Sequence, residues 1–244
     1  MAEVWLGTSG WSYPEWVGRF YPNGTSPPRM LEFYGHRFRA VEAHSTFRRL
    51  PDPSVLRRWT ASVPEAFRFV PKANAGITHR RDLDSLEDRV LVFLDSLAPL
   101  GSRLGPVLFS FPHAAPDLTR LERVLTALAA YGGVRAAFDL KSDWHTPEVL
   151  TRLDRAGAAF VVTDREGNGT RDEGRLPSAG KVGELAYVRL RRERYDRAAL
   201  ERWAEGLVKA RADGREVYAF VKHDELGHGP RYARQLQAAI ARLG

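Results

Sequence analysis

The chain has 244 residues, of which 43% are hydrophobic and 27% charged, and it contains no cysteine. This composition is typical of a folded globular protein and excludes a disulfide framework, a thiolate metal site and a cysteine nucleophile. No apolar run approaches the roughly 20 residues that a membrane-spanning helix needs. The amino-terminal stretch lacks the basic and apolar regions of a secretory signal. We therefore expect a cytoplasmic protein without a membrane partner.

The formal net charge of +7 would attract polyanions and raises nucleic acid as a partner. Only five of the 37 basic residues are lysines, and the arginines are spread along most of the chain. A GC-rich genome or selection for thermal stability produces the same composition without any anionic partner. Charge alone leaves both interpretations open.

Short apolar runs alternate along the chain with longer stretches of helical spacing. Helix starts are indicated where a capping side chain precedes the helical stretch, at Asp52, Asp117, Thr146 and Asp196. The predicted strands, in chain order, are Val4–Leu6, Ala40–Ala43, Phe67–Val70, Val107–Phe111, Arg135–Phe138, Ala159–Thr163, Ala186–Leu190 and Glu216–Val221.

Eight strands separated by helices and followed by a last helix favour an α/β fold, a single TIM-like (β/α)8 barrel with parallel strands, over an open doubly wound sheet. About 250 residues is a common size for such a barrel, so residues 1–244 would form one domain. The segment Arg165–Glu184 lacks helical periodicity and predicts a long connection between the sixth and seventh strands. No Gly-x-Gly-x-x-Gly follows the first strand and no Walker loop is present, so no nucleotide cofactor is indicated.

Ionisable side chains follow two of the predicted strands. Glu42 and His44 are two residues apart, so in a strand they project to the same side at its carboxyl end, where α/β proteins build their sites. Lys72 follows the third strand, and the loop after it ends in Thr78 and His79. These positions predict where the protein acts.

Several motifs follow one another in a fixed order along the chain. They are Gly7-Thr-Ser-Gly-Trp-Ser-Tyr13, Trp16, Gly18, Phe20-Tyr-Pro22, Val41-Glu42, Ser45-Thr-Phe47, Leu50-Pro51, Phe67-Arg-Phe69, Lys72, Ile77-Thr-His79, Gly105-Pro-Val-Leu-Phe109, Pro112, Trp144, Tyr187-Val-Arg-Leu190 and Tyr195. Together these motifs resemble the DUF72 family, also called YecE-like proteins. The resemblance implies a TIM-like barrel and a family without an established activity.

The chain departs from the family pattern at positions near the expected site. His44 stands where the family favours Asn, and Arg48 where it has Tyr. The remaining departures are Ser110-Phe111 for Gln-Pro, Asp139-Leu-Lys141-Ser142 for Glu-x-Arg-His, Arg191-Arg192 for His-Gly and Lys222-His223 in place of Asn. These changes put any inherited substrate in doubt.

The predicted catalytic residues are Glu42, Lys72, His79 and Asp139, with Glu42 as general base or acid. Structural alternatives to these roles are open. Glu42 could be a structural carboxylate neutralised by Lys72 or Arg189, and His79 could do no more than form a hydrogen bond with the backbone. The aromatic side chains after the first strand could stack a sugar or base, or simply cap the barrel. The predicted substrate-binding residues are Trp11, Tyr13, Lys141, Asp164, Arg189 and His223.

Two functional hypotheses follow. The first is an enzyme that binds a phosphorylated or otherwise anionic small molecule, with Lys72, Lys141 and Arg189 on the anion; its reaction stays open between hydrolysis and isomerisation. The second is a nucleic-acid-binding or nuclease-like protein, with Arg191, Arg192 and Arg194 on phosphates.

A metal is considered but not favoured, because lysines near the centre already supply positive charge and no metal-binding spacing confirms a site. The side chains that could ligate a metal are Glu42, His44, His79, Asp139, Asp164 and His223.

Overall fold

The computed structural model describes residues 3–166, 174, 176 and 184–244. Its strands are β1 (Val4–Thr8), β2 (Ala40–Ala43), β3 (Arg68–Pro71), β4 (Val107–Ser110), β5 (Ala136–Asp139), β6 (Ala159–Asp164), β7 (Leu185–Leu190) and β8 (Glu216–Val221). Its α-helices are α1 (Pro27–Gly35), α2 (Ser45–Arg48), α3 (Pro53–Ala61), α4 (Ala75–Thr78), α5 (Leu86–Ser96), α6 (Leu118–Tyr131), α7 (Pro147–Arg155), α8 (Arg197–Ala212) and α9 (His228–Leu243). Three 3-10 helices are η1 (Pro14–Trp16), η2 (Ala98–Arg103) and η3 (Ser142–Trp144).

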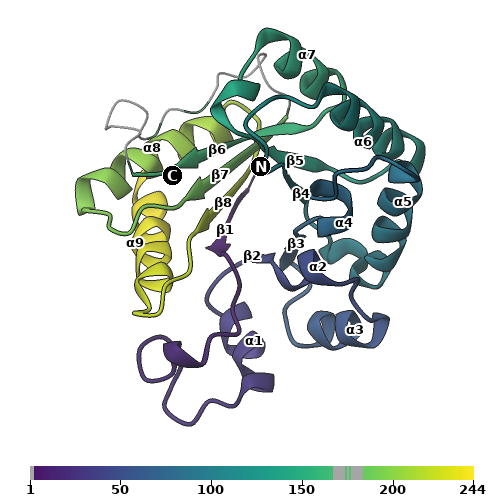
Figure 1. The fold of residues 1–244 in the computed structure, drawn as a ribbon. Coiled ribbons are helices and arrows are strands. Elements are labelled where there is room, and N and C mark those ends of the chain that lie inside the picture. The colour runs from purple at the N-terminus through teal and green to yellow at the C-terminus, as the bar shows by residue number, and fades with distance from the viewer. Residues whose placement is uncertain (1–2, 167–173, 175, 177–183) are drawn as a thin grey trace.

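All strand pairings between these elements are parallel, and helices surround the strands (Figure 1). Six strands form one sheet in the order β1-β8-β7-β6-β5-β4, and β2 pairs with β3. Isolated bridges join Ser9 to Glu42 and Lys72 to Leu108, so the β2-β3 pair meets both edges of the larger sheet. The chain therefore has an α/β fold in which a parallel sheet forms at least a half-barrel.

The predicted strands agree with the observed ones to within two residues at each end. The helix caps also form as expected: Asp52, Asp117, Thr146 and Asp196 each accept a hydrogen bond from a backbone N–H of the first helical turn. Most of the predicted connection Arg165–Glu184 lies outside the described residues.

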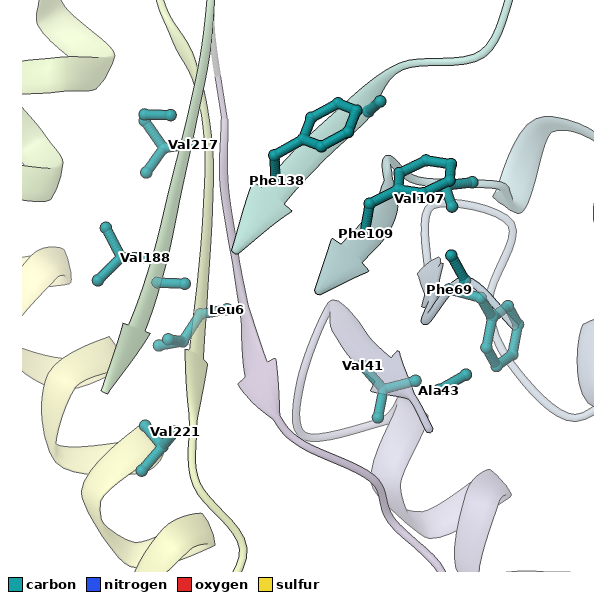
Figure 2. Packing of buried hydrophobic residues seen from close by; sticks show 14 of the residues in the cluster. Leu6, Val41, Ala43, Phe69, Val107, Phe109, Phe138, Val188, Val217 and Val221 are labelled. Carbon is teal, nitrogen blue, oxygen red and sulfur yellow. The ribbon is translucent and has the colours of Figure 1, made fainter. Parts of the chain in front are cut away.

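The hydrophobic core has two layers separated by the sheet. An inner cluster lies on one face of the strands and includes Trp5, Val70 and Tyr218. The larger cluster fills the space between the strands and the helices; Figure 2 shows Val188 and Val221 on the side of their strands that faces helices α8 and α9. Side chains thus alternate between the two layers along each strand, and this alternation decides which polar residues reach the inner face at the strand ends.

Gly7 has a specific role where β1 passes β2. A Cβ on Gly7 would lie only 1.8 Å from the Ala40 carbonyl oxygen, so no larger residue fits there. The Tyr34 hydroxyl accepts a hydrogen bond from the Thr8 N–H at 2.7 Å in the same region. This close approach brings Ser9, just after β1, alongside Glu42.

Candidate functional site

Three charged side chains from β2, β5 and β7 meet at the carboxyl ends of the strands. Arg189 Nη1 lies 2.5 Å from Asp139 Oδ2, and its Nη2 lies 3.0 Å from Glu42 Oε2. All three side chains are at least nine-tenths buried. We call Glu42, Asp139 and Arg189 the inner triad. It fulfils the requirement that buried charges be paired, and it confirms that these predicted residues come together.

Glu42 is saturated with donors. Besides Arg189, its carboxylate accepts hydrogen bonds from Ser9 Oγ at 2.8 Å and from Tyr187 OH at 2.7 Å, and it contacts His44 Nε2 at 2.8 Å. Burial alone would raise the pKa of Glu42, but the Arg189 guanidinium and the hydrogen bonds hold that pKa well below its ordinary value. Burial and the Glu42 carboxylate raise the pKa of Tyr187 well above its ordinary value. These contacts favour a charge-holding role for Glu42 over the predicted general base.

His44 is held by Glu42 through one ring nitrogen. Its Nε2 contacts Glu42 Oε2, which leaves Nδ1 as the nitrogen that can serve another group. A third of the His44 side chain is exposed, whereas Glu42 is fully buried. A carboxylate that orients an imidazole in this way is a recurring part of acid–base sites.

Asp139 is held by neighbours on both sides. Ser110 Oγ donates to Oδ2 at 3.3 Å, and Thr163 Oγ1 donates to Oδ1 at 3.0 Å. Arg165 Nη2 lies 4.0 Å from Oδ1. Ser110, a departure from the family pattern, is therefore a partner of Asp139.

Besides Arg165, the cations Lys72 and Arg191 lie beside the inner triad. Within the described part of the chain, Lys72 has no carboxylate in ion-pair distance; its Nζ lies 4.3 Å from the centre of the Phe47 ring. Arg191 Nη1 is shielded from solvent and finds no hydrogen-bond partner among the described residues. Burial and the positive charge of Arg189 lower the pKa of both Lys72 and Arg191. We call His44, Lys72 and Arg191 the outer layer.

The balance of charge in this region is positive. The two carboxylates of the inner triad are already paired with Arg189. Lys72 and Arg191 come in addition, so these five ionised groups sum to one excess positive charge, and Arg165 near Asp139 adds a further one. An anion bound beside Lys72 and Arg191 would restore neutrality.

His79 lies near Lys72 across a shared aromatic ring. Its ring meets Phe47 edge-on at 4.9 Å between centroids, and its Nδ1 is 2.8 Å from Thr78 Oγ1. Burial and the charge of Lys72 lower the pKa of His79. The predicted pair of Lys72 and His79 is thus brought together, with His79 displaced toward the edge of the site.

Tyr13 and His223 border the site from the loops after β1 and β8. Their rings stack in parallel, 4.2 Å apart at 7°. Tyr13 OH donates to the Ser9 carbonyl at 2.6 Å, and burial together with Glu15 raises the pKa of Tyr13 to about 12. Burial lowers the pKa of His223. Through Ser9, this stacked pair is connected to Glu42.

Asp164 does not join the inner triad, contrary to the prediction that it lies in the mouth. Its carboxylate instead accepts from Arg192 Nε at 2.8 Å and from Trp203 Nε1 of α8 at 3.1 Å. The reason is the two-residue alternation: Thr163 faces Asp139, so Asp164 faces the helices. Burial raises the pKa of Asp164. Arg192, predicted to contact phosphates, is engaged in this ion pair.

Lys141 and the remaining aromatic residues take varied places. Lys141 is half-buried and precedes η3, and it forms no ion pair with a described residue. Trp16 and Tyr21 are core residues with 0% and 1% exposure. Trp11 packs edge-on against Trp59 at 4.8 Å. Packing therefore explains most of the aromatic motif after β1.

A cleft of about 700 Å³ opens beside the site between α1 and α3. His44 and Tyr13 line it, so it adjoins the outer layer. Its walls are mainly apolar, with Trp11, Trp59 and Leu31 among them. Such a volume is in the range of small-molecule pockets, roughly 300–1,000 Å³.

The amino end of α9 is already occupied by a carboxylate. Asp224 accepts hydrogen bonds from the N–H groups of Leu226, His228 and Gly229 at 2.6 to 3.0 Å. Barrels often bind phosphate at the last strands through a helix amino end. Here those donors are satisfied within the chain, and the outer layer offers the alternative.

Among the residues that the structure describes, no group of three or more His, Asp or Glu side chains is placed to hold a metal ion. Of the side chains considered as metal ligands, Glu42 and Asp139 are bound to Arg189 and Asp164 is bound to Arg192. In the described part of the chain, no helix has the length and apolar character needed to cross a bilayer.

Comparison with known proteins places this architecture in a family. The family model described as "Protein of unknown function DUF72" matches residues 5–243. The chain belongs to the DUF72 family. The resemblance noted from the motifs is thereby confirmed.

Relatives and solved structures agree with this membership. The chain is 33% identical over 109 residues to the UPF0759 protein YecE of Escherichia coli K12, covering 45% of this chain and 38% of YecE. It is 31% identical over 115 residues to the UPF0759 protein YunF of Bacillus subtilis, covering 45% and 40%. The match thus spans about two fifths of these relatives.

The similar solved structures are DUF72 family proteins. One from Enterococcus faecalis V583 has a TM-score of 0.78 at 19% identity, covering 98% of this chain and 96% of its own. One from Thermotoga maritima MSB8 has a TM-score of 0.76 at 22% identity, covering 98% and 99%. At such identities the likeness shows the fold alone.

Sequence reasoning missed Ser9, Tyr187 and Thr163 as members of the site, and it considered Arg191 only as a phosphate contact in the nucleic-acid hypothesis. Each is two residues from another inward-facing position: Arg191 follows Arg189, and Tyr187 precedes it. Applying the two-residue alternation along every strand would have found them once one inward residue was known.

Proposed function

We propose that the protein is an enzyme that binds a small anionic molecule at the carboxyl ends of the strands and acts on it by general acid–base chemistry. The observation that carries this proposal is the pair of cations, Lys72 and Arg191, which have no ionic partner among the described residues and lie beside a histidine bound to a buried carboxylate. We further propose that β2 and β3 complete a closed (β/α)8 barrel of one domain, supported by the bridges at Ser9 and Lys72.

The division of labour follows from the contacts. Lys72 and Arg191 would bind the anion, because both are partly desolvated and neither is paired with a carboxylate in the described part of the chain. His44 would exchange the proton through Nδ1, since its Nε2 is held by Glu42. Glu42 would keep the imidazole oriented, while Arg189 and Asp139 fix Glu42. His79 would assist from the other side of Phe47.

This assignment leaves the reaction open between hydrolysis and isomerisation, since both need an anion site and a proton acceptor. Phosphate esters and carboxylates are the substrate classes that the two cations favour. The nucleic-acid alternative is weaker, because Arg192 is held by Asp164.

Anion binding is tested by titrating inorganic phosphate into the protein by calorimetry. Replacing Lys72 or Arg191 by Ala removes a charge-assisted hydrogen bond, so we expect phosphate to bind at least about tenfold more weakly. The matched control is Lys209→Ala, which removes an exposed lysine of α8. Equal affinity in Lys72→Ala, Arg191→Ala and the control would refute the anion site.

The acid–base role is tested with a panel of phosphorylated and carboxylated small molecules, with products identified by mass. On any substrate that turns over, His44→Ala should lower kcat by about 100-fold or more while phosphate affinity stays near that of the wild type. Unchanged kcat in His44→Ala would remove His44 from the proposed chemistry.

A further inference from the structure

The cleft beside the site has rigid aromatic walls. Trp59 stacks on Phe69 at 5.5 Å and 27°, and Trp11 meets Trp59 at 90°. Trp59 is only half-buried although its ring is held by these neighbours. Leu31 and the prolines at the start of α1 form the opposite wall. A fixed indole that keeps part of its apolar surface open is suited to a flat apolar ring.

The cleft and the outer layer share residues. His44 lines the cleft and also contacts Glu42, and Tyr13 lines the cleft while stacking on His223. Arg191 follows Arg189 of the inner triad by two residues, and its guanidinium is among the charges that act on Tyr13 and His223. An apolar space therefore opens onto a cationic one, and His44 stands between them.

We propose that the site takes small molecules that carry a planar apolar ring at one end and an anionic group at the other. The ring would occupy the cleft against Trp59, and the anion would lie beside Lys72 and Arg191, with His44 facing the bond between the two parts. This inference rests on the proposed anion site and adds the class of substrate. A compact polar anion would leave the cleft unfilled.

Two non-hydrolysable phosphonates separate the two parts of the inference. Methylphosphonate carries only the anion, and benzylphosphonate carries the same anion with a ring. Calorimetry on the wild type should show benzylphosphonate binding about tenfold more tightly, as expected for partial burial of a ring. Equal affinities would overturn the ring site and leave the anion site intact. If neither phosphonate binds, both the ring site and the anion site are overturned.

Variants locate each end of the ligand. Trp59→Ala should abolish the advantage of benzylphosphonate without changing the affinity for methylphosphonate, and Trp59→Phe should keep most of it. Ala61→Trp should also abolish the advantage, because Ala61 is an exposed residue at the cleft and a larger side chain would fill it. It serves as the second test if Trp59→Ala unfolds. An advantage that survives in both variants would overturn the assignment of the cleft.

The anionic end is tested against a competing cation. Arg58 also lines the cleft and is exposed. Lys72→Ala should weaken both phosphonates by the same factor, whereas Arg58→Ala should leave both unchanged. The reverse result would place the anion at the outer rim of the cleft and would overturn the proposed orientation.

Discussion

The inner triad and the outer layer lie next to each other but are built in opposite ways. Glu42, Asp139 and Arg189 are buried and bound to one another, and further donors occupy the remaining lone pairs of Glu42. Lys72 and Arg191 have the same kind of charge as Arg189 but are paired with no carboxylate of the residues that the structure describes. The first group makes the fold tolerate charge at its centre, and the second leaves charge available to a ligand.

The position of a charged residue along the strand decides whether its side chain is paired with the buried carboxylates. Arg189 and Arg191 come from the same strand end, two residues apart, and face the same side. One lies level with the carboxylates of β2 and β5; the other lies beyond them. We therefore infer that similar side chains two residues apart divide into a structural set and a proposed ligand-binding set.

The largest effect is expected from Glu42→Gln. The variant keeps the shape of the side chain but leaves Arg189 short of one counter-charge in a buried place, which costs about 3–5 kcal/mol of unfolding free energy. Urea unfolding measures this loss of unfolding free energy. The control is Glu87→Gln, which breaks a partly exposed ion pair with Arg123 and should cost at most about 1 kcal/mol. Similar losses of unfolding free energy in the two variants would mean that the buried inner triad contributes no more than a partly exposed ion pair.

The pH dependence of the unfolding free energy tests the lowered pKa of Glu42. The folded-state pKa of Glu42 is lowered, so the stability it provides is present above its ordinary value of 4.5 and is lost as the pH falls from there toward the folded-state value. Asp164 has the opposite sign, because burial raises its pKa; its contribution is present below its ordinary 3.8 and is lost as the pH rises through its raised value. Unfolding free energy measured from pH 6 to pH 3 should therefore fall less steeply in Glu42→Gln than in the wild type (about 1.4 kcal/mol corresponds to each unit of pKa difference). An identical slope in both proteins would contradict the lowered pKa of Glu42.

The outer layer should show a gain in stability when its charge is removed. Lys72→Met keeps the aliphatic stem on Phe47 but removes an ammonium group that is partly desolvated and close to Arg189. We expect the unfolding free energy to rise by about 0.5–2 kcal/mol, as is common when a functional residue is replaced. Phosphate binding should weaken in the same variant. A loss of stability would show that Lys72 belongs with the structural set.

Much of the fold could be predicted from the sequence because its signals are local. Short apolar runs bounded by turns marked the strands, and Asp52 and Thr146 before proline marked two helix starts. In α5, Leu86, Val90 and Phe93 have the spacing of one helix face, and all three are fully buried.

The pairing of Glu42 with Arg189 was one of the alternatives that the sequence left open. The other charge pairings could not be predicted, because they depend on which face of each strand turns inward. Both faces of these strands are buried, one against the helices and one inside, so hydrophobic alternation does not distinguish them. Asp164 was misplaced for this reason: it ends β6 as Asp139 ends β5, yet only Asp139 faces Arg189. The cleft beside Trp59 depends on how α1 and α3 stand apart, which no local pattern contains.

The smallest expected effect is on the affinity for nucleic acid. It tests whether the arginines after β7 form a concentrated phosphate-binding surface. Because Arg192 is held by Asp164, only Arg191 and Arg194 of the basic run are available to phosphates, and Arg194 is exposed. We expect weak oligonucleotide binding by fluorescence anisotropy that disappears near physiological salt. In a plot of log affinity against log salt, each phosphate contact contributes a slope of about −0.7 to −0.9. Arg194→Ala should reduce that slope by about one contact and leave benzylphosphonate binding unchanged, since Arg194 lies outside the outer layer. Sub-micromolar binding that resists salt would reverse the ranking of the two functions and make the outer layer part of a nucleic-acid surface.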